Sequence, residues 1–111
     1  MTETPIALIT GAAQGIGLAC ARALKDDGYE VILADINGEG VAKAAAEIGA
    51  LAGIECDLGA SAQIEAMFAR IAREHGVISA LVNNAGIALP GDFLSYPAED
   101  FDRVIEILGR I

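Results

Sequence analysis

The sequence predicts one α/β domain built on a parallel sheet, and two observations support this prediction. Apolar runs of about five residues, which are typical of buried strands, alternate with segments that have apolar residues at spacings of three and four. The second kind of segment is typical of helices that pack on a sheet. Strands that alternate with helices pair in parallel through right-handed crossovers. We therefore expect a single domain over residues 1–111.

The expected elements follow one another in the order β-α-β-α-β-α-β-α. Asn37-Gly38 predicts a turn before the second helix, and Ser61 is the expected N-cap of the third. Gly28 and Gly49 stand where a glycine commonly ends a helix. The four strands are expected at residues 6–10, 30–34, 51–56 and 79–84, and the helices at about 15–27, 40–48, 61–76 and from 98 onward.

Composition and charge exclude several classes of function. Apolar residues make up 54% of the chain, which excludes a disordered chain. Its formal net charge of −9 argues against nucleic acid and anionic membrane surfaces as partners. No apolar run is long enough to span a bilayer, and the N-terminal residues do not resemble a signal peptide. The two cysteines, Cys20 and Cys56, have no metal-binding spacing and are expected to be free thiols. We therefore expect a cytoplasmic protein without a metal site.

The most informative stretch runs from Thr10 to Gly17, between the first expected strand and the first expected helix. Gly11 permits the sharp turn from strand to helix, Gly15 permits close approach of a phosphate, and Gly17 permits close packing of helix on sheet. The N-terminus of the helix offers N–H groups and a partial positive charge to an anion. The alternative is a tight turn without a ligand, which the three glycines in this context make less favoured.

Asp35 ends the second expected strand, about 20 residues beyond the glycine-rich loop. A carboxylate there can accept hydrogen bonds from both hydroxyls of an adenosine ribose, and it would repel a 2′-phosphate. Neither Gln14 nor Ile36 offers a positive charge to such a phosphate, so NAD is preferred over NADP. The alternative is that Asp35 only begins the turn at Asn37-Gly38.

Two further polar groups follow later strands at the same edge of the sheet. Asp57 comes after the third strand and can accept the adenine amino group, although an aspartate before a helix is often only a cap. Asn83 and Asn84 end the fourth strand and need partners, because unpaired buried polar groups cost about 1–3 kcal/mol each. One amide can tie this strand to its neighbours and the other can line a crevice, or both can be structural.

Together these motifs resemble the classical short-chain dehydrogenases/reductases. The resemblance rests on Thr10-Gly11-x-x-x-Gly15-x-Gly17, Asp35, Asp57-Leu58 and Asn83-Asn84-Ala85-Gly86, and it covers nearly the whole chain. It implies a doubly wound Rossmann fold with strand order 3-2-1-4 and NAD as cofactor. The implied cofactor-binding residues are Gly11, Gln14, Gly15, Ile16 and Gly17 for the pyrophosphate, Asp35 and Ile36 for the adenosine ribose, Asp57 and Leu58 for the adenine, and Asn84, Ala85 and Gly86 for the ribose nearer the nicotinamide.

The family's catalytic residues do not occur in this chain. The family uses a serine and a Tyr-x-x-x-Lys pair, but Leu33 and Asp100 stand four residues after Tyr29 and Tyr96. The family's catalytic Asn is also absent from the stretch after residue 107. We therefore assign no catalytic residue and expect the cofactor-binding half of such an enzyme, without hydride transfer by this chain alone.

Three alternatives remain open for this chain. It can be a binding half that is silent by itself, an oxidoreductase completed by another half, or an engineered or truncated Rossmann fragment with a vestigial cofactor site. The edge of the fourth strand and one side of the last helix, which carries Phe101 and Val104, would lack the neighbours they have in the family. We therefore expect homo-oligomers that form through this edge and this helix.

Overall fold

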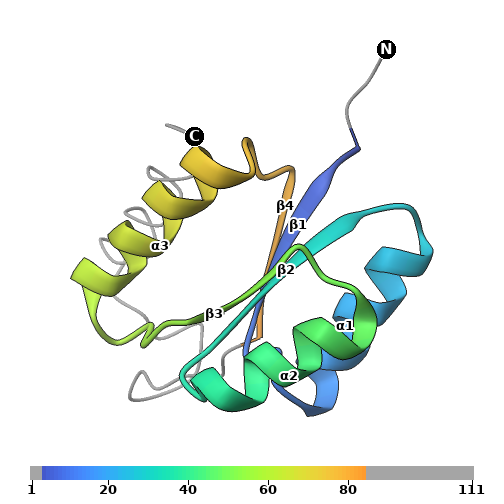
Figure 1. Ribbon diagram of the computed structural model, residues 1–111, viewed down its shortest axis with the longest axis horizontal. Coiled ribbons are helices and arrows are strands. Elements are labelled where there is room, and N and C mark those ends of the chain that lie inside the picture. The colour runs from blue at the N-terminus through green and yellow to red at the C-terminus, as the bar shows by residue number, and fades with distance from the viewer. Residues whose placement is uncertain (1–3, 85–111) are drawn as a thin grey trace.

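The computed structural model describes residues 4–84, and these form a parallel sheet with helices on both faces. The strand order is β3-β2-β1-β4, which confirms the Rossmann-type order expected from the resemblance (Figure 1). The fourth expected helix lies outside the described residues. The elements are β1 (Ile6–Thr10), α1 (Gly15–Asp26), β2 (Glu30–Asp35), α2 (Gly38–Ile48), β3 (Ala52–Glu55), α3 (Ser61–Glu74) and β4 (Ala80–Asn83).

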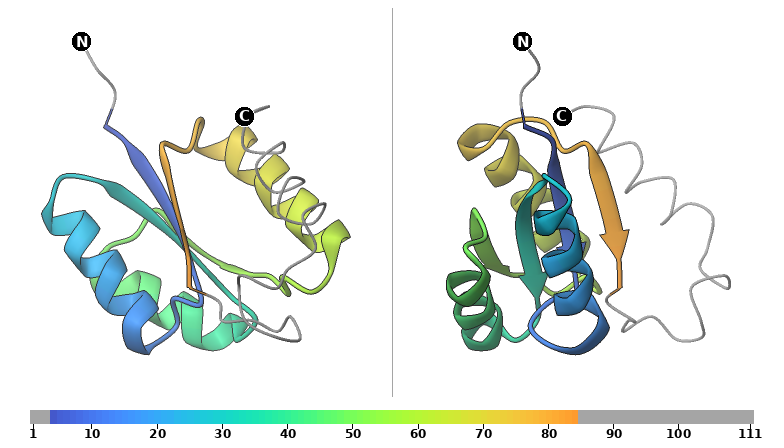
Figure 2. Two further views of the ribbon diagram at one scale, coloured as in Figure 1. Left: turned by 180° about the vertical axis from the view of Figure 1, so that it is seen from behind. Right: turned by 90° about the vertical axis from the view of Figure 1, so that its right-hand side faces the viewer.

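Alternate residues of the central strands face opposite sides of the sheet. Ala7 and Ile9 of β1 belong to the core beneath α1 and α2, whereas Leu8 packs with Phe68 and Ile71 of α3. Figure 2 shows α1 and α2 on one face and α3 on the other. Every residue of β1 is buried, which explains why its sequence is a continuous apolar run ending in a threonine.

Two helix starts differ from the sequence prediction. Helix α2 begins two residues earlier than expected, because Asn37 is its N-cap and accepts a hydrogen bond from Gly40 N at 2.9 Å. Ser61 is the first residue of α3 and not its N-cap, so that prediction was wrong. The N-cap is Ala60, whose carbonyl accepts from the backbone N–H groups of Gln63 and Ile64.

The expected helix ends at the two glycines are confirmed. Gly28 follows the C-cap Asp27 with φ 101°, and Gly49 is the C-cap of α2 with φ 71°. Both values lie in the left-handed region that glycine tolerates. No helix within residues 4–84 is both long enough and apolar enough to cross a membrane.

The parallel arrangement places the carboxyl ends of the four strands at one edge of the sheet. Thr10, Asp35, Glu55 and Asn83 are the last residues of β1, β2, β3 and β4. In register, Thr10 pairs with Asn83, and Asp35 pairs with Glu55. The polar groups singled out from the sequence therefore converge on this edge, where open α/β sheets bind ligands.

Candidate functional site

The glycine-rich loop between β1 and α1 uses its glycines for different purposes. Gly11 and Gly15 have φ values of 62° and 64°, which side-chain-bearing residues rarely adopt. A Cβ on Gly15 would have no heavy atom within 4 Å, so the backbone there faces open space. A Cβ on Gly17 would overlap the carbonyl oxygen of Gly11 and lie 2.8 Å from Asn84 Nδ2. Gly17 therefore allows α1 to pack directly against the end of β1.

The N-terminus of α1 carries no side-chain cap. Gln14 occupies the N-cap position in extended conformation, with φ −164°, and its side chain makes no capping hydrogen bond. The first turn contains no acidic residue, and Ile16 beside it is 73% exposed. The first N–H groups of a helix lack partners within the helix, and the helix dipole gives them a partial positive charge. This helix start can bind an anion.

Asp35 lies at the end of β2 and contacts the glycine-rich loop. Its Oδ2 accepts a hydrogen bond from Ala13 N at 3.0 Å, and its Oδ1 accepts one from Asn37 N at 3.0 Å. The hydrogen bond from Asn37 N corresponds to the alternative role of Asp35, which is to begin the turn at Asn37-Gly38. Each carboxylate oxygen can accept a further hydrogen bond, so the turn contact leaves acceptor capacity for a ligand. The next residue, Ile36, is 65% exposed.

Asp57 lies in the loop between β3 and α3 and organises it. Its Oδ1 accepts from Gly59 N at 2.8 Å, while its own N–H donates to Gln63 Oε1 at 2.9 Å. Leu58 is half-buried against the core beneath α3. Burial, and to a smaller extent the negative charge of Asp57, raises the pKa of the Cys56 thiol, which therefore stays protonated at neutral pH.

The ends of β1 and β4 are joined through the Thr10 hydroxyl. This group donates to Asn83 Oδ1 at 2.9 Å and accepts from Asn84 N at 2.9 Å. Asn84 Nδ2 donates to the carbonyl of Gly11 at 3.5 Å. Both amides therefore hold β4 to the start of the glycine-rich loop. Ala85 and Gly86, the other two residues expected near the nicotinamide, lie outside the described residues.

Sequence reasoning missed three contributors to this edge. Local sequence patterns identify Thr10 only as part of a motif and indicate no role for the Ala13 N–H or the Gln63 side chain. A signal for Thr10 was present, because a polar residue that ends a fully apolar strand needs a buried partner. Ala13 carried no signal, since its contribution is a backbone N–H group.

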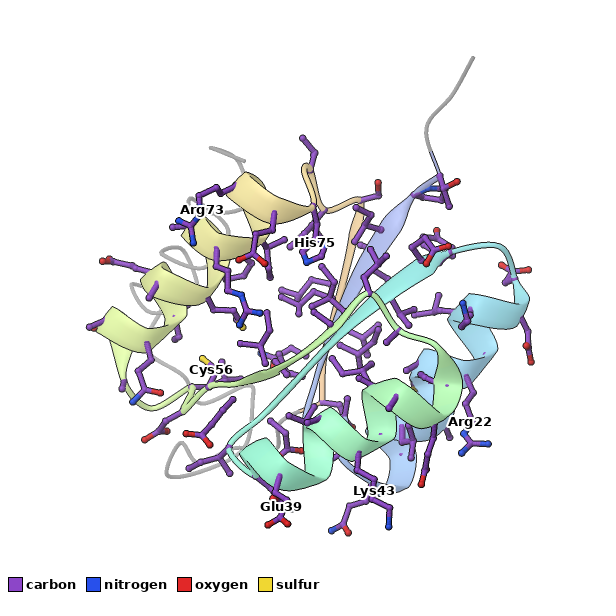
Figure 3. The ribbon with its side chains drawn as sticks, in the orientation of Figure 1. Arg22, Glu39, Lys43, Cys56, Arg73 and His75 are labelled. Carbon is purple, nitrogen blue, oxygen red and sulfur yellow. The ribbon has the colours of Figure 1, made fainter. Side chains whose placement is uncertain are left out.

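Three basic side chains of the helices lie away from this site. Figure 3 shows Arg22, Lys43 and Arg73 on the outer surfaces of α1, α2 and α3. The carboxyl edge itself carries acidic residues, among them Asp35 and Glu55. Residues 4–84 contain no cluster of three or more His, Cys, Asp or Glu side chains suited to a metal ion.

Comparison with known proteins agrees with this geometry. The model of the short chain dehydrogenase family matches residues 5–108. The chain belongs to this family. Within this family it is 38% identical, over 92% of its length, to a 3-beta-hydroxysteroid dehydrogenase of Comamonas testosteroni. It is also 43% identical, over 93% of its length, to the probable oxidoreductase EphD of Mycobacterium tuberculosis.

Solved structures show the same likeness. A 3-ketoacyl-(acyl-carrier-protein) reductase from Brucella melitensis, complexed with NADH, superimposes with a TM-score of 0.73 at 31% identity and covers 97% of this chain. The chain spans only part of each of these proteins: 41% of the Comamonas dehydrogenase, 18% of EphD and 48% of the Brucella reductase.

Proposed function

We propose that this chain is the NAD(H)-binding part of a short-chain dehydrogenase/reductase oxidoreductase. The observation that supports this most directly is the start of α1. It has no side-chain cap, no acidic residue in its first turn, and a left-handed Gly15 that faces open space. These features suit a pyrophosphate, which would be held by Gly11, Gln14, Gly15, Ile16 and Gly17.

The residues at the end of β2 suit an adenosine ribose. Asp35 would accept hydrogen bonds from the two hydroxyls, and the exposed side chain of Ile36 would cover the adenosine beside it. A 2′-phosphate would meet the negative charge of Asp35, with no guanidinium or ammonium group at Gln14 or Ile36 to offset it. We therefore infer a preference for NAD over NADP.

The remaining contacts belong to the two ends of the cofactor. Asp57 and Leu58 would flank the adenine, and Asn84, Ala85 and Gly86 would meet the ribose nearer the nicotinamide. The cofactor would supply hydride transfer between its nicotinamide and an alcohol or ketone. The residues of this chain would bind and orient the cofactor. They would not transfer the proton, because the serine, tyrosine and lysine that the family uses for that step are absent from residues 1–111.

We also propose a cellular setting and an assembly state. The thiols of Cys20 and Cys56 are free, which fits a reducing compartment such as the cytoplasm. Within residues 4–84, β4 has a strand neighbour on one side only, and its apolar residues are half-buried. We propose that copies of the chain associate through this edge. Sedimentation equilibrium at micromolar concentrations should show dimers or larger species, and a clean monomer would contradict it.

Calorimetric titration with NADH and NADPH tests the binding proposal. We expect NADH to bind and NADPH to bind more weakly. The variant Asp35→Ala should lose affinity for NADH while retaining its circular dichroism spectrum. No heat with NADH up to millimolar concentration would overturn the proposal and favour a vestigial site. Reduction of a ketone panel by the wild-type chain alone would show that it needs no second half.

A further inference from the structure

The glycine-rich loop is tied to the end of β2 by two consecutive hydrogen bonds. Ala12 N donates to the Ala34 carbonyl at 3.2 Å, and Ala13 N donates to Asp35 Oδ2 at 3.0 Å. The first bond joins two backbones and would exist with many side chains at position 35. The second depends on the carboxylate and joins residues 22 positions apart in the sequence.

The other oxygen of the same carboxylate is bound as well. Asp35 Oδ1 accepts from Asn37 N at 3.0 Å, within the turn that leads to α2. One carboxylate therefore bridges the loop before α1 and the turn before α2. An asparagine could not replace it, because its amide has one oxygen and its NH₂ group would face the second N–H donor. Hydrogen bonds to an ionised acceptor are also stronger than those between neutral groups.

We propose that Asp35 is a positioning residue for the glycine-rich loop, in addition to the direct ribose contact assigned to it above. Its hydrogen bond fixes the position of Ala13. Gln14 and Gly15, which follow, then adopt the conformation in which the first N–H groups of α1 are available to a ligand. The inference rests on the proposed function, since it deepens the role of one residue of that site. It predicts that Asp35 contributes to binding even when the ligand has no ribose hydroxyls to offer.

The same contact decides which N–H groups of the loop serve a ligand. The Ala13 N–H is used within the protein, and pyrophosphate would be bound by the groups that follow it, at the start of α1. This role would explain why the acidic Asp35 lies beside the proposed pyrophosphate site. The charge of Asp35 is partly offset by two N–H dipoles, and the loop gains a fixed shape.

The first test needs no ligand. Amide hydrogen exchange of Ala13 is measured by NMR in the wild-type chain, in Asp35→Ala and in Glu55→Ala. Glu55 pairs with Asp35 in register and is exposed, so its variant removes a neighbouring charge without touching the loop. We expect exchange at Ala13 to accelerate at least about tenfold in Asp35→Ala only, as the loss of a hydrogen bond to a charged group implies. Ala12, whose bond is to a backbone carbonyl, should remain protected. Unchanged exchange at Ala13 would overturn the inference.

The second test separates the loop from the ribose. An NADH analogue that lacks both hydroxyls on the adenosine ribose is titrated into the wild-type chain, Asp35→Ala and Glu55→Ala. If the carboxylate acts through the loop, Asp35→Ala should bind this analogue several-fold more weakly than the wild-type chain and Glu55→Ala do. Equal affinities would show that Asp35 acts through the hydroxyls alone and would overturn the inference. If neither NADH nor the analogue binds the wild type, the proposed function fails, and the exchange at Ala13 alone decides the positioning role.

Discussion

Helices α1 and α2 lie on the same face of the sheet and begin with the same Gly-x-Gly pattern, but their N-termini are capped differently. Helix α1 starts with Gly15-Ile16-Gly17 and α2 starts with Gly38-Glu39-Gly40. Asn37 caps α2 by accepting from Gly40 N, and Glu39 adds a negative charge to its first turn. The start of α1 has neither feature.

This difference shows that a Gly-x-Gly pattern at a helix start does not by itself make an anion site. Both helices have a dipole and follow a parallel strand at the same edge. In α2 the side chain of Asn37 binds the N–H of Gly40, whereas no side chain caps α1, where we propose that a ligand binds. Helix α3, on the other face, also starts without a side-chain cap, but Gly59 before it is not in the left-handed region and Asp57 precedes it.

Giving α1 the features of α2 should have the largest effect on binding. In Gln14→Asp the new carboxylate would cap α1 and lie where we place the pyrophosphate. We expect NADH affinity to fall on the order of 100-fold, since like charges a few Å apart near a protein surface repel by about 1–4 kcal/mol. The free energy of unfolding should rise by about 0.5–1 kcal/mol. Calorimetric titration and urea unfolding measure the two quantities.

Gln14→Ser is the matched control for this change, because it can cap α1 without adding a charge. It should raise stability similarly and reduce NADH affinity far less than Gln14→Asp does. Wild-type affinity in Gln14→Asp would mean that the start of α1 is not the phosphate site.

The next largest difference is expected in the free energy of unfolding, at the third residue of each helix, Gly17 in α1 and Gly40 in α2. In Gly17→Ala the methyl group would meet the backbone of Gly11, which cannot move without displacing β1 or α1. We expect a loss of about 1–3 kcal/mol in the free energy of unfolding, as overpacking typically costs. In Gly40→Ala the methyl group would meet the side chain of Asn37, which can rotate away at the loss of its capping bond, about 1 kcal/mol. Urea unfolding should therefore show the smaller loss in Gly40→Ala, and equal losses would refute the packing role of Gly17.

Substitutions at the first residue of each helix, Gly15 in α1 and Gly38 in α2, separate the cost of an unfavourable backbone conformation from the cost of a side-chain contact. Gly15→Ala would place alanine at φ 64°, which costs about 1–2 kcal/mol, although its methyl group meets nothing. That group would occupy the space proposed for the pyrophosphate, so NADH affinity should fall about tenfold. In Gly38→Ala the methyl group would overlap the carboxylate of the exposed Glu55 side chain, which can rotate away, and would lie 3.0 Å from Glu55 Cβ. Its stability should fall less than that of Gly15→Ala, and its NADH affinity should be unchanged; a loss of affinity in both variants would contradict the assignment.

The parts of this fold that the sequence predicted are those set by local patterns. The buried strand at residues 6–10 was predicted with its observed bounds, because five consecutive apolar or small residues between a proline and a glycine allow few alternatives. The helix starts were less well predicted. Asn37 was interpreted as part of a turn, although its side chain caps α2, and Ser61 was interpreted as a cap although Ala60 holds that position.

The candidate site was predicted at the level of residues and not of contacts. The order of strands places Asp35 and Asn84 at the edge where Gly15 lies, and this follows from the family's motifs. The bond from Ala13 to Asp35 and the role of the Thr10 hydroxyl join residues 22 and 73 positions apart. Such partners depend on the twist of the sheet and on the path of the loop, which local patterns do not specify.

The smallest expected effect comes from the cap of α2. Asn37→Ala removes the acceptor for Gly40 N but leaves the backbone N–H that Asp35 Oδ1 accepts. We expect the free energy of unfolding to fall by about 1 kcal/mol, as the loss of an N-cap typically costs, and NADH affinity to be unchanged. Asn37→Asp keeps the capping oxygen and should restore stability. Urea unfolding and calorimetric titration of both variants would then show that the two helix starts are used differently, α2 for stability and α1 for binding. A loss of NADH affinity in Asn37→Ala that Asn37→Asp does not restore would place the turn before α2 within the binding site and remove that distinction.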